Sequence, residues 1–324
     1  MVDGFINFNL NEKTPTIIKV IGVGGGGGNA VEYMYEKGIC DVDFVICNTD
    51  YQALRNSPIP CKIQLGKELT AGHGAGNNPA MGEKSAQESL ADIEAILKKD
   101  TRMAFITAAM GGGTGTGAAP VIAKLSKDMG ILTVGIVSVP ARFEGPKRLD
   151  QARDGLRRLK DHVDCLIVID NEKIKSIYGS QTISQAFAKA NDVLNIAAKG
   201  IAEIITLPGY INVDFADVRT VMTDSGVAIM GAAQASGEDR AIRAITEALE
   251  SPLLNNNDIL GAKDILLNIT SGTDEITMDE MSQITSHIIR KVGNNAAVIW
   301  GVGTDPDLGD AVSVTIIATG FPTG

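Results

Sequence analysis

Three glycine-rich segments of the sequence indicate a binding site for phosphate groups. They are Gly22–Asn29 (GVGGGGGN), Gly72–Asn78 (GHGAGNN) and Gly111–Gly117 (GGGTGTG). Backbone without Cβ atoms lets N–H groups and the positive ends of helices approach phosphate oxygens closely. In the third segment, Thr114 and Thr116 add hydroxyl donors. Three such loops at one edge of a sheet predict a site for a polyphosphate.

The first of these segments also has a plainer interpretation, as a tight turn between a strand and a helix. It contains a GxGxxG match (Gly22, Gly24 and Gly27), which alone is weak evidence for a dinucleotide site. A nicotinamide-dependent oxidoreductase would use that match together with Asn48 and Asp50. Such an enzyme leaves the other two loops unexplained, and the sequence offers no clear catalytic His or Lys. The sequence has no GxxxxGKS or GxxxxGKT motif, which excludes a P-loop NTPase.

The elements that would position these loops follow from an alternation of apolar strands with helices. In the first half we expect strands at Ile17–Val23, Phe44–Cys47, Ile63–Leu65, Met103–Thr107, Leu132–Val139 and Leu166–Ile169. Among the connecting helices, one runs from Ala30 to Lys37, one from Pro79 through Leu97, and one follows Gly117 with Pro120 in its first turn. Continuous apolar strands joined by helices predict a parallel sheet covered on both faces, with its ligands beyond the carboxyl ends of the strands.

The pattern changes at Thr182. From there to Thr206 apolar residues recur every three or four positions, which predicts one long helix. After it we expect helices at Arg240–Leu249 and Met278–Val292, and strands at Ile265–Thr270, Ala297–Val302 and Val312–Ala318. The predicted fold is therefore α/β, and its parts are an N-terminal extension (1–16), a Rossmann-like parallel-sheet domain (17–181), a central connecting helix (182–207) and a smaller C-terminal α/β domain with a mixed sheet (208–324).

Charge and composition limit the classes of function. With 29 basic and 39 acidic residues the formal net charge is −10, which argues against a nucleic-acid-binding protein. An anionic ligand must then be held by backbone N–H groups, helix ends and a metal ion. The three histidines and the four cysteines (Cys40, Cys47, Cys61 and Cys165) show no zinc spacing. We therefore expect no metal site made by the protein alone, and buried free thiols in a reducing compartment.

No segment has the pattern of a targeting or membrane signal. The first 15 residues lack a basic start followed by an apolar core. The longest apolar stretches, such as Ile131–Val139, are much shorter than the ~18 residues of a membrane span. We expect a soluble cytoplasmic protein that does not insert directly into a membrane.

Two of the glycine motifs together resemble those of a known family. GGGTGTG at Gly111–Gly117 is similar to the tubulin-superfamily signature, and with GVGGGGGNA at Gly22–Ala30 the chain resembles FtsZ, the family of bacterial cell-division GTPases. The resemblance extends from about Lys19 to Gly320. It implies that residues 17–181 bind GTP or GDP with Mg²⁺, with a monovalent cation as a further candidate. It also implies that residues 208–324 form a GTPase-activating and assembly domain.

The resemblance further implies a cytoskeletal protein that assembles with itself into filaments of the division ring at midcell. Division-ring proteins and membrane adaptors are the other expected partners. Members of the family usually continue with a linker and a terminal peptide that docks such adaptors, whereas this chain stops at Gly324. We expect a truncated form that polymerises without recruiting itself to the membrane. A tubulin-like protein that assembles but hydrolyses GTP poorly is the alternative.

The resemblance also assigns nucleotide contacts. Glu144 would accept hydrogen bonds from the ribose hydroxyls and Arg148 would approach the phosphates, although a solvated helix charge is the plainer interpretation of Arg148. Phe187 would stack on the base, although its spacing alone favours core packing. Asp192 could accept from both N1–H and N2–H of guanine, which favours GTP over ATP. The full expected set is Gly24, Gly25, Gly26, Asn48, Gly111, Gly112, Gly113, Thr114, Gly115, Thr116 and Gly117 on the phosphate side and after the second strand, Gly74, Ala75, Gly76 and Asn77 in the γ-phosphate loop, Glu144 and Arg148 at the ribose, and Asn29, Asn171, Phe187 and Asp192 at the base.

A second candidate site is the acidic segment Asn212–Asp217 (NVDFAD). Its plainer interpretation is a helix N-cap with acidic residues in the first turn. In the functional interpretation, Asp214 and Asp217 polarise an attacking water that Asn212 helps to position. Because a carboxylate is a weak base, orienting the water suits these residues better than deprotonating it, and this fits a loose phosphoryl-transfer transition state.

The long helix separates the two candidate sites. About 19 helical residues between Phe187 and the helix end span nearly ~30 Å. One nucleotide cannot easily contact both sites in a single chain, so the acidic loop serves the nucleotide of the next subunit or it is not catalytic. A head-to-tail contact of this kind does not close into a dimer but propagates as a filament.

Overall fold

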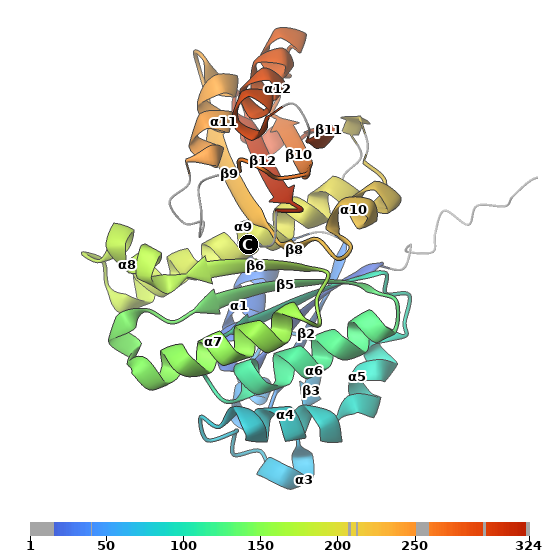
Figure 1. The fold of residues 1–324 in the computed structure, drawn as a ribbon, viewed down its shortest axis with the longest axis vertical. Helices are drawn as coiled ribbons and strands as arrows, with labels where there is room; N and C mark the ends of the chain where they lie inside the picture. The colour runs from blue at the N-terminus through green and yellow to red at the C-terminus, as the bar shows by residue number, and fades with distance from the viewer. Residues whose placement is uncertain are drawn as a thin grey trace, which may run out of the picture.

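The computed structural model describes residues 16–39, 41–206, 209–211, 213–250, 259–293 and 296–321. These residues form two α/β parts with one long helix between them (Figure 1). The part at the bottom of Figure 1 carries the larger sheet and comes mainly from the first half of the sequence. The part at the top comes from the second half.

A seven-stranded parallel sheet with the order β3-β2-β1-β4-β5-β6-β8 forms the first part. The first six strands in the chain lie within two residues of the expected ones at each end, so the predicted parallel sheet is confirmed. Every residue of β1 is buried, as expected for a strand covered on both faces. The strands are β1 (Ile18–Val23), β2 (Val42–Asn48), β3 (Cys61–Gln64), β4 (Met103–Ala109), β5 (Leu132–Val139), β6 (Cys165–Asp170) and β8 (Gly226–Val227).

Helices cover both faces of this sheet. One face shares a core with α1 (Gly24–Glu36) and α9 (Ile183–Thr206). The other face packs against α4 (Pro79–Glu88), α5 (Leu90–Leu97), α6 (Thr114–Asp128) and α7 (Pro146–Lys160). Shorter elements complete this part, namely α2 (Tyr51–Asn56), α3 (Lys67–Thr70), the 3-10 turn η1 (Arg142–Glu144) and α8 (Asn171–Tyr178).

Two helices begin earlier than expected. α1 starts at Gly24 rather than at Ala30, because its glycines let the first turns lie directly on the sheet. A Cβ atom on Gly27 would overlap the carbonyl oxygen of Thr107 in β4. α6 also begins inside the predicted loop, so Pro120 lies within the helix rather than in its first turn. The predicted starts of both helices were wrong because glycine has a low helix propensity and its runs were taken as loops.

The single helix expected after Pro79 is two helices, α4 and α5. Ser89 separates them, and its hydroxyl oxygen accepts a hydrogen bond of 3.1 Å from the backbone N–H of Gly66. Ala86 before the break and Ile93 after it are both buried in the same core. The apolar spacing therefore continues across the break and does not reveal it.

A five-stranded mixed sheet with the order β7-β11-β10-β12-β9 forms the second part. β10 and β11 pair in parallel, and the other neighbours are antiparallel. The expected mixed sheet is confirmed, although β7 and β9 were not expected. The elements are β7 (Gly209–Ile211), α10 (Phe215–Met222), β9 (Ile229–Ala235), α11 (Arg240–Leu249), β10 (Asp264–Ser271), α12 (Met278–Val292), β11 (Ala297–Thr304), η2 (Pro306–Leu308) and β12 (Val312–Thr319).

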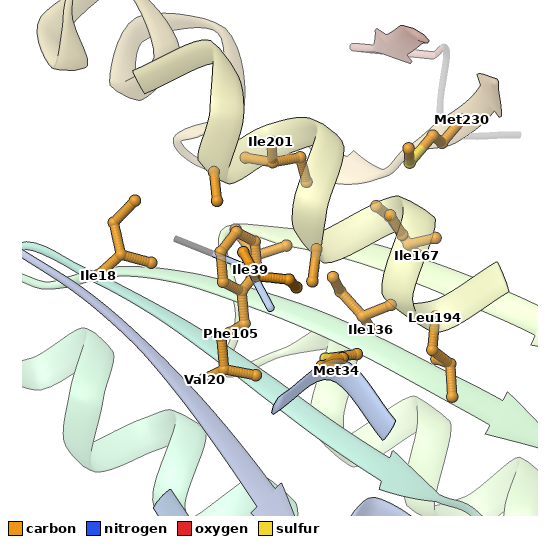
Figure 2. Close-up of a cluster of buried hydrophobic side chains, with 14 of the residues drawn as sticks. Ile18, Val20, Met34, Ile39, Phe105, Ile136, Ile167, Leu194, Ile201 and Met230 are labelled. Atoms are coloured by element: carbon orange, nitrogen blue, oxygen red, sulfur yellow. The ribbon is translucent and has the colours of Figure 1, made fainter. Parts of the chain in front are cut away.

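The apolar face of α9 packs on both sheets. Figure 2 shows Leu194 and Ile201 of α9 close to Phe105 and Ile136 of the first sheet, with Met230 of β9 beside the same helix. The second face of the smaller sheet is covered by α11 and α12. α9 therefore joins the two parts, and its length sets the distance between the segments at its two ends.

One segment from the second half of the sequence belongs to the first sheet. β8 follows α10 in the chain and pairs with β6 as the last strand of the larger sheet. In addition, α10 places Val218 and Met222 in the core that α9 shares with that sheet. The division between the two sheets thus does not coincide with the boundary expected after residue 207.

We expect Ile201→Ala to lower the free energy of unfolding by about 2–5 kcal/mol, because Ile201 is fully buried between α9 and the sheet. The matched control is Ile196→Ala on the same helix. Its side chain is 38% exposed, so its effect should stay within about 0.5 kcal/mol. Denaturant titration followed by circular dichroism measures both variants. Equally small effects would contradict the importance of this face of α9.

Candidate functional site

The three glycine-rich loops meet at the carboxyl edge of the first sheet. A Cβ atom on Gly24 would lie 2.8 Å from the Gly115 nitrogen, and one on Gly113 would lie 2.7 Å from the Asn78 nitrogen. A pocket of 410 Å³ opens at this edge. The expected residues that line it are Gly25, Gly26, Asn29, Gly112, Gly113, Thr114, Gly115, Glu144, Arg148, Asn171 and Phe187.

Two helix N-termini open into this pocket. α1 begins directly after β1 and α6 begins five residues after β4, on neighbouring strands of a parallel sheet. Neither helix has an acidic residue in its first turn. A Cβ atom on Gly25 or Gly112 would have nothing within 4 Å, so the backbone is open to the pocket at both positions. The first turn of an α-helix leaves N–H groups without a partner inside the helix, and together with the two positive helix ends this favours an anion in the pocket.

In the loop Gly111–Gly117, Thr116 and Gly117 lie behind the pocket wall and do not line the pocket. The hydroxyl oxygen of Thr116 accepts a hydrogen bond of 2.8 Å from the backbone N–H of Gly111, which holds the start of the loop. Gly111 itself has a φ of +103°, a conformation that favours glycine. A Cβ atom on Gly117 would overlap the carbonyl oxygen of Pro79, so this glycine lets α4 and α6 pack closely.

The loop Gly72–Asn78 lies beside the loop Gly111–Gly117 and outside the pocket lining. The backbone N–H of Gly74 donates to the carbonyl oxygen of Thr49 (3.2 Å), and the side-chain amide of Gln151 donates to the carbonyl oxygen of Asn77 (3.2 Å). Ala75 is buried against Gly113. The expected γ-phosphate residues, including Gly76, are thus anchored next to the pocket from two sides.

Asn48 and Gly24 line a smaller pocket of 210 Å³ that shares Gly25 and Asn29 with the larger one. Asn48 is buried, and its Oδ1 accepts a hydrogen bond of 3.2 Å from the backbone N–H of Asp50. Together the two pockets run along the N-terminal turns of α1.

Elsewhere in the lining of the main pocket, Glu144 and Arg148 form an ion pair of 2.9 Å. The second oxygen of Glu144 accepts a hydrogen bond from the Ala141 N–H (3.0 Å), so the carboxylate is fixed in place. Arg148 lines the pocket, but it is half exposed and pairs with Glu144 of the preceding helical turn, so its approach to the phosphates stays a prediction. Phe187 is 44% exposed and lines the pocket, which excludes the core position that its spacing favoured.

Asn171 has an unpaired polar atom in the lining of the pocket. Its Oδ1 is buried and has no hydrogen-bond partner among the described residues, although Asn171 lines the pocket. Buried acceptors without a partner are rare in folded proteins because they lose water without compensation. The Asn171 amide is therefore suited to a ligand donor.

Asp192 does not line the pocket. Its Oδ1 accepts a hydrogen bond of 3.1 Å from the hydroxyl of Tyr33. Burial, followed by the negative charge of Asp192, raises the pKa of Tyr33, so the tyrosine remains a donor. Asn191 lines the pocket instead and was not expected as a site residue. Its spacing of four from Phe187 on a helix would have placed both on one face.

The acidic segment forms the start of α10. Asp214 is the N-cap of this helix, and its Oδ1 accepts a hydrogen bond of 2.9 Å from the backbone N–H of Asp217. The N-cap interpretation is therefore confirmed, and both carboxylates are exposed. Asn212 lies outside the described residues. In Figure 1, α10 is on the right, whereas the arrowheads of β5 and β6 point to the left, toward α8.

The described residues contain no cluster of three His, Cys, Asp or Glu side chains that could hold a metal ion. Cys47 and Cys165 are buried free thiols, and burial raises the pKa of both, to about 12 for Cys165. Cys61 is partly buried and free, and Cys40 lies outside the described residues.

Family models match both parts of the chain. The model described as the tubulin/FtsZ family GTPase domain matches residues 17–179, and the FtsZ family C-terminal domain matches residues 226–322. The cell division protein FtsZ of Porphyromonas gingivalis is 50% identical over 324 residues, covering 99% of this chain and 71% of the relative. The chain belongs to the tubulin/FtsZ family. It is an FtsZ-type cell-division GTPase of the tubulin superfamily, so its first part is a GTPase domain.

Solved structures agree with this assignment. An FtsZ structure from M. jannaschii superimposes with a TM-score of 0.88 at 43% identity and covers 95% of this chain and 89% of that chain. CetZ2 from Haloferax volcanii superimposes with a TM-score of 0.76 at 21% identity, covering 93% and 92%, which shows a shared fold. In the described part of the chain, no helix has both the length and the apolar character needed to cross a membrane.

We expect Gly25→Ala to weaken GTP binding about tenfold or more, a loss of at least ~1.4 kcal/mol. The added methyl group would stand in the main pocket without touching the protein. Gly28→Ala is the control, since Gly28 also has room for a Cβ atom but lines only the smaller pocket. Both changes should keep or raise the thermal midpoint because alanine favours helix. Equal binding by the two variants would argue against phosphates at Gly25.

Proposed function

We propose that this chain binds GTP in the main pocket, assembles head to tail into filaments of the cell-division ring, and hydrolyses GTP at the contact between subunits. The acidic loop before α10 of one subunit completes the site on its neighbour. The filament works in the cytoplasm at midcell together with division-ring proteins and membrane adaptors. The observation that carries the proposal is the position of the pocket and the acidic loop at opposite ends of α9.

The phosphate end of the pocket supports this ligand. The chain has a formal net charge of −10, so a polyanion cannot rely on a general excess of basic residues. The N-termini of α1 and α6 supply backbone N–H groups and partial positive charge instead. The anchored loop with Gly74 and Asn77 adjoins Gly113 of the pocket lining, which supports a contact between this loop and the terminal phosphate.

The other end of the pocket supports guanine. The unpaired Oδ1 of Asn171 can accept a hydrogen bond from a base N–H group. Asp192 follows the lining residue Asn191 and has one oxygen on Tyr33, so it would have to turn its other oxygen into the pocket to accept from N1–H or N2–H of guanine, which adenine lacks. The exposed ring of Phe187 can stack on the base at the pocket wall.

Magnesium fits this pocket only as a companion of the nucleotide. Glu144 is the single carboxylate among the lining residues, and it is already bound to Arg148. Mg²⁺ keeps several waters and binds phosphate oxygens readily, so one hydroxyl ligand would suffice, and Thr114 is the candidate. When bound, the ion would neutralise charge on the phosphates. Thr114 is held by a hydroxyl–hydroxyl hydrogen bond of 2.7 Å to Thr49.

The length of α9 supports hydrolysis between subunits. Its 24 residues span ~36 Å, with Phe187 near the start and Asp214 beyond the end. A nucleotide in the pocket cannot reach Asp214 of its own chain. A contact between two different surfaces that does not close produces a filament. The matched M. jannaschii FtsZ structure is described as a dimer, which agrees with self-association.

We expect Asp214→Asn to abolish most assembly-dependent hydrolysis and to retain GTP binding. Asparagine caps helices as well as aspartate does, so the hydrogen bond to Asp217 and the thermal midpoint should be preserved. Asp214→Ala, in contrast, should also lose about 1 kcal/mol of stability. Phosphate release and thermal unfolding separate the two roles. Undiminished hydrolysis by Asp214→Asn would leave Asp214 with the capping role alone.

A mixture of variants tests whether the site is shared. Asp214→Asn subunits keep an intact pocket, and Gly25→Ala subunits keep an intact acidic loop. One junction type in a mixed filament would combine both intact halves, so the mixture should hydrolyse GTP faster than either variant alone. A mixture no faster than the sum of its components would contradict hydrolysis between subunits.

A further inference from the structure

α10 is held against the GTPase domain at the far end of α6. Lys127 lies in the last turn of α6, and its Nζ is 2.6 Å from Oδ1 of Asp224 and 3.2 Å from Oδ1 of Asp164. Asp224 follows α10 by two residues. Arg219 of α10 also donates a hydrogen bond of 3.4 Å to the carbonyl oxygen of Gly130, just after α6. Two polar contacts therefore join the C-terminal ends of these helices.

The turn after α10 is hydrogen-bonded to Asp164, which also pairs with Lys127. Asp164 is 5% exposed, and its Oδ1 accepts a hydrogen bond from the Asp224 N–H (3.4 Å). Its carbonyl oxygen accepts from the Ser225 hydroxyl (3.4 Å) and from the Gly226 N–H (3.0 Å). β8 then joins the sheet beside β6. We call Lys127, Asp164 and Asp224 the α10 clasp.

The clasp adds direction to a contact that is otherwise apolar. α10 has only eight residues, and its buried side chains are Val218, Val221 and Met222. Apolar packing is not directional, so it would allow a short helix to rotate or slide. Ion pairs and hydrogen bonds at its C-terminal end restrict such movement. Asp214 at the other end of α10 is exposed and makes its hydrogen bond within the same helix turn.

We propose that Lys127 and Asp224 are positioning residues, which fix the direction in which Asp214 and Asp217 point toward the nucleotide of the next subunit. This inference rests on the proposed hydrolysis between subunits. α6 begins at the pocket with Thr114 and ends at the clasp. One helix thus connects the phosphate loop of a subunit with the acidic loop that the same subunit offers to its neighbour.

The charge state of Lys127 agrees with this role. Partial burial acts to lower the pKa of Lys127, but the hydrogen bond to Asp224 and the charge of Asp164 outweigh it and raise the pKa. Lys127 is therefore charged at neutral pH. Asp224 is 74% exposed on its side chain, so the pair adds little to overall stability. The expected consequence of breaking it is a loss of orientation with the fold retained.

Asp224→Asn is the most specific variant. It removes the charge, and asparagine tolerates the φ of +50° at this position. The matched control is Asp128→Asn at the same end of α6, where the aspartate pairs with Lys124 of that helix. Lys127→Met removes the positive charge of the clasp. Lys127→Arg should preserve the ion pairs because arginine keeps that charge.

We expect Asp224→Asn to lower the hydrolysis rate per assembled subunit about tenfold, since small misplacements of reacting groups cost this much or more. GTP affinity, critical concentration and thermal midpoint should equal those of the unmodified chain, as should every property of Asp128→Asn. Lys127→Met should show the same loss of rate, whereas Lys127→Arg should keep the rate of the unmodified chain. Rates for Asp224→Asn and Lys127→Met equal to that of the unmodified chain would overturn the proposal.

Mixing then locates the defect. Asp224→Asn subunits mixed with Gly25→Ala subunits should regain activity, because the defective loop is replaced by that of the neighbour. If Asp214→Asn recovers in this mixture but Asp224→Asn does not, the clasp acts on its own pocket and the proposal fails. If neither recovers, hydrolysis between subunits fails, and the proposed function falls with the inference.

Discussion

The rigid length of α9 constrains every functional interpretation of this chain. The helix is packed into the core from Ala190 onward, since Leu194 and Ile201 pack on the first sheet while Met230 of the second sheet lies beside it (Figure 2). Its two ends therefore cannot approach one another. Phe187 and Asn191 stay with the pocket, and the acidic loop stays at the far end. An active site that needs both must be made by two molecules.

The net negative charge of the chain explains why glycine is frequent where phosphates are expected. Because acidic residues outnumber basic ones, a polyanion has to be bound at close range by backbone N–H groups. Gly25 and Gly112 line the pocket and leave room for such an approach. Other glycines, such as Gly27 and Gly117, let helices lie against a neighbouring carbonyl oxygen. Binding and packing together account for the glycine-rich motifs.

Strands and most helices were predictable because apolar runs report burial directly, and the loops were correctly expected to meet because parallel strands end at one edge. The sequence could not separate glycines that face the pocket from those that pack helices, nor show that Thr116 holds Gly111. Phe187 has the spacing of a core residue but is exposed. The sequence could not show this, because tertiary structure decides which part of a helix face is covered. β8 was missed since two residues carry no pattern.

The most direct test of a shared active site is the rate of phosphate release from GTP, measured against total protein concentration. A site completed by a neighbouring subunit predicts negligible release below a critical concentration and a linear rise above it. The onset should coincide with filament formation measured by sedimentation or light scattering. Strict proportionality to protein from the lowest concentrations would show a self-contained site and contradict this account.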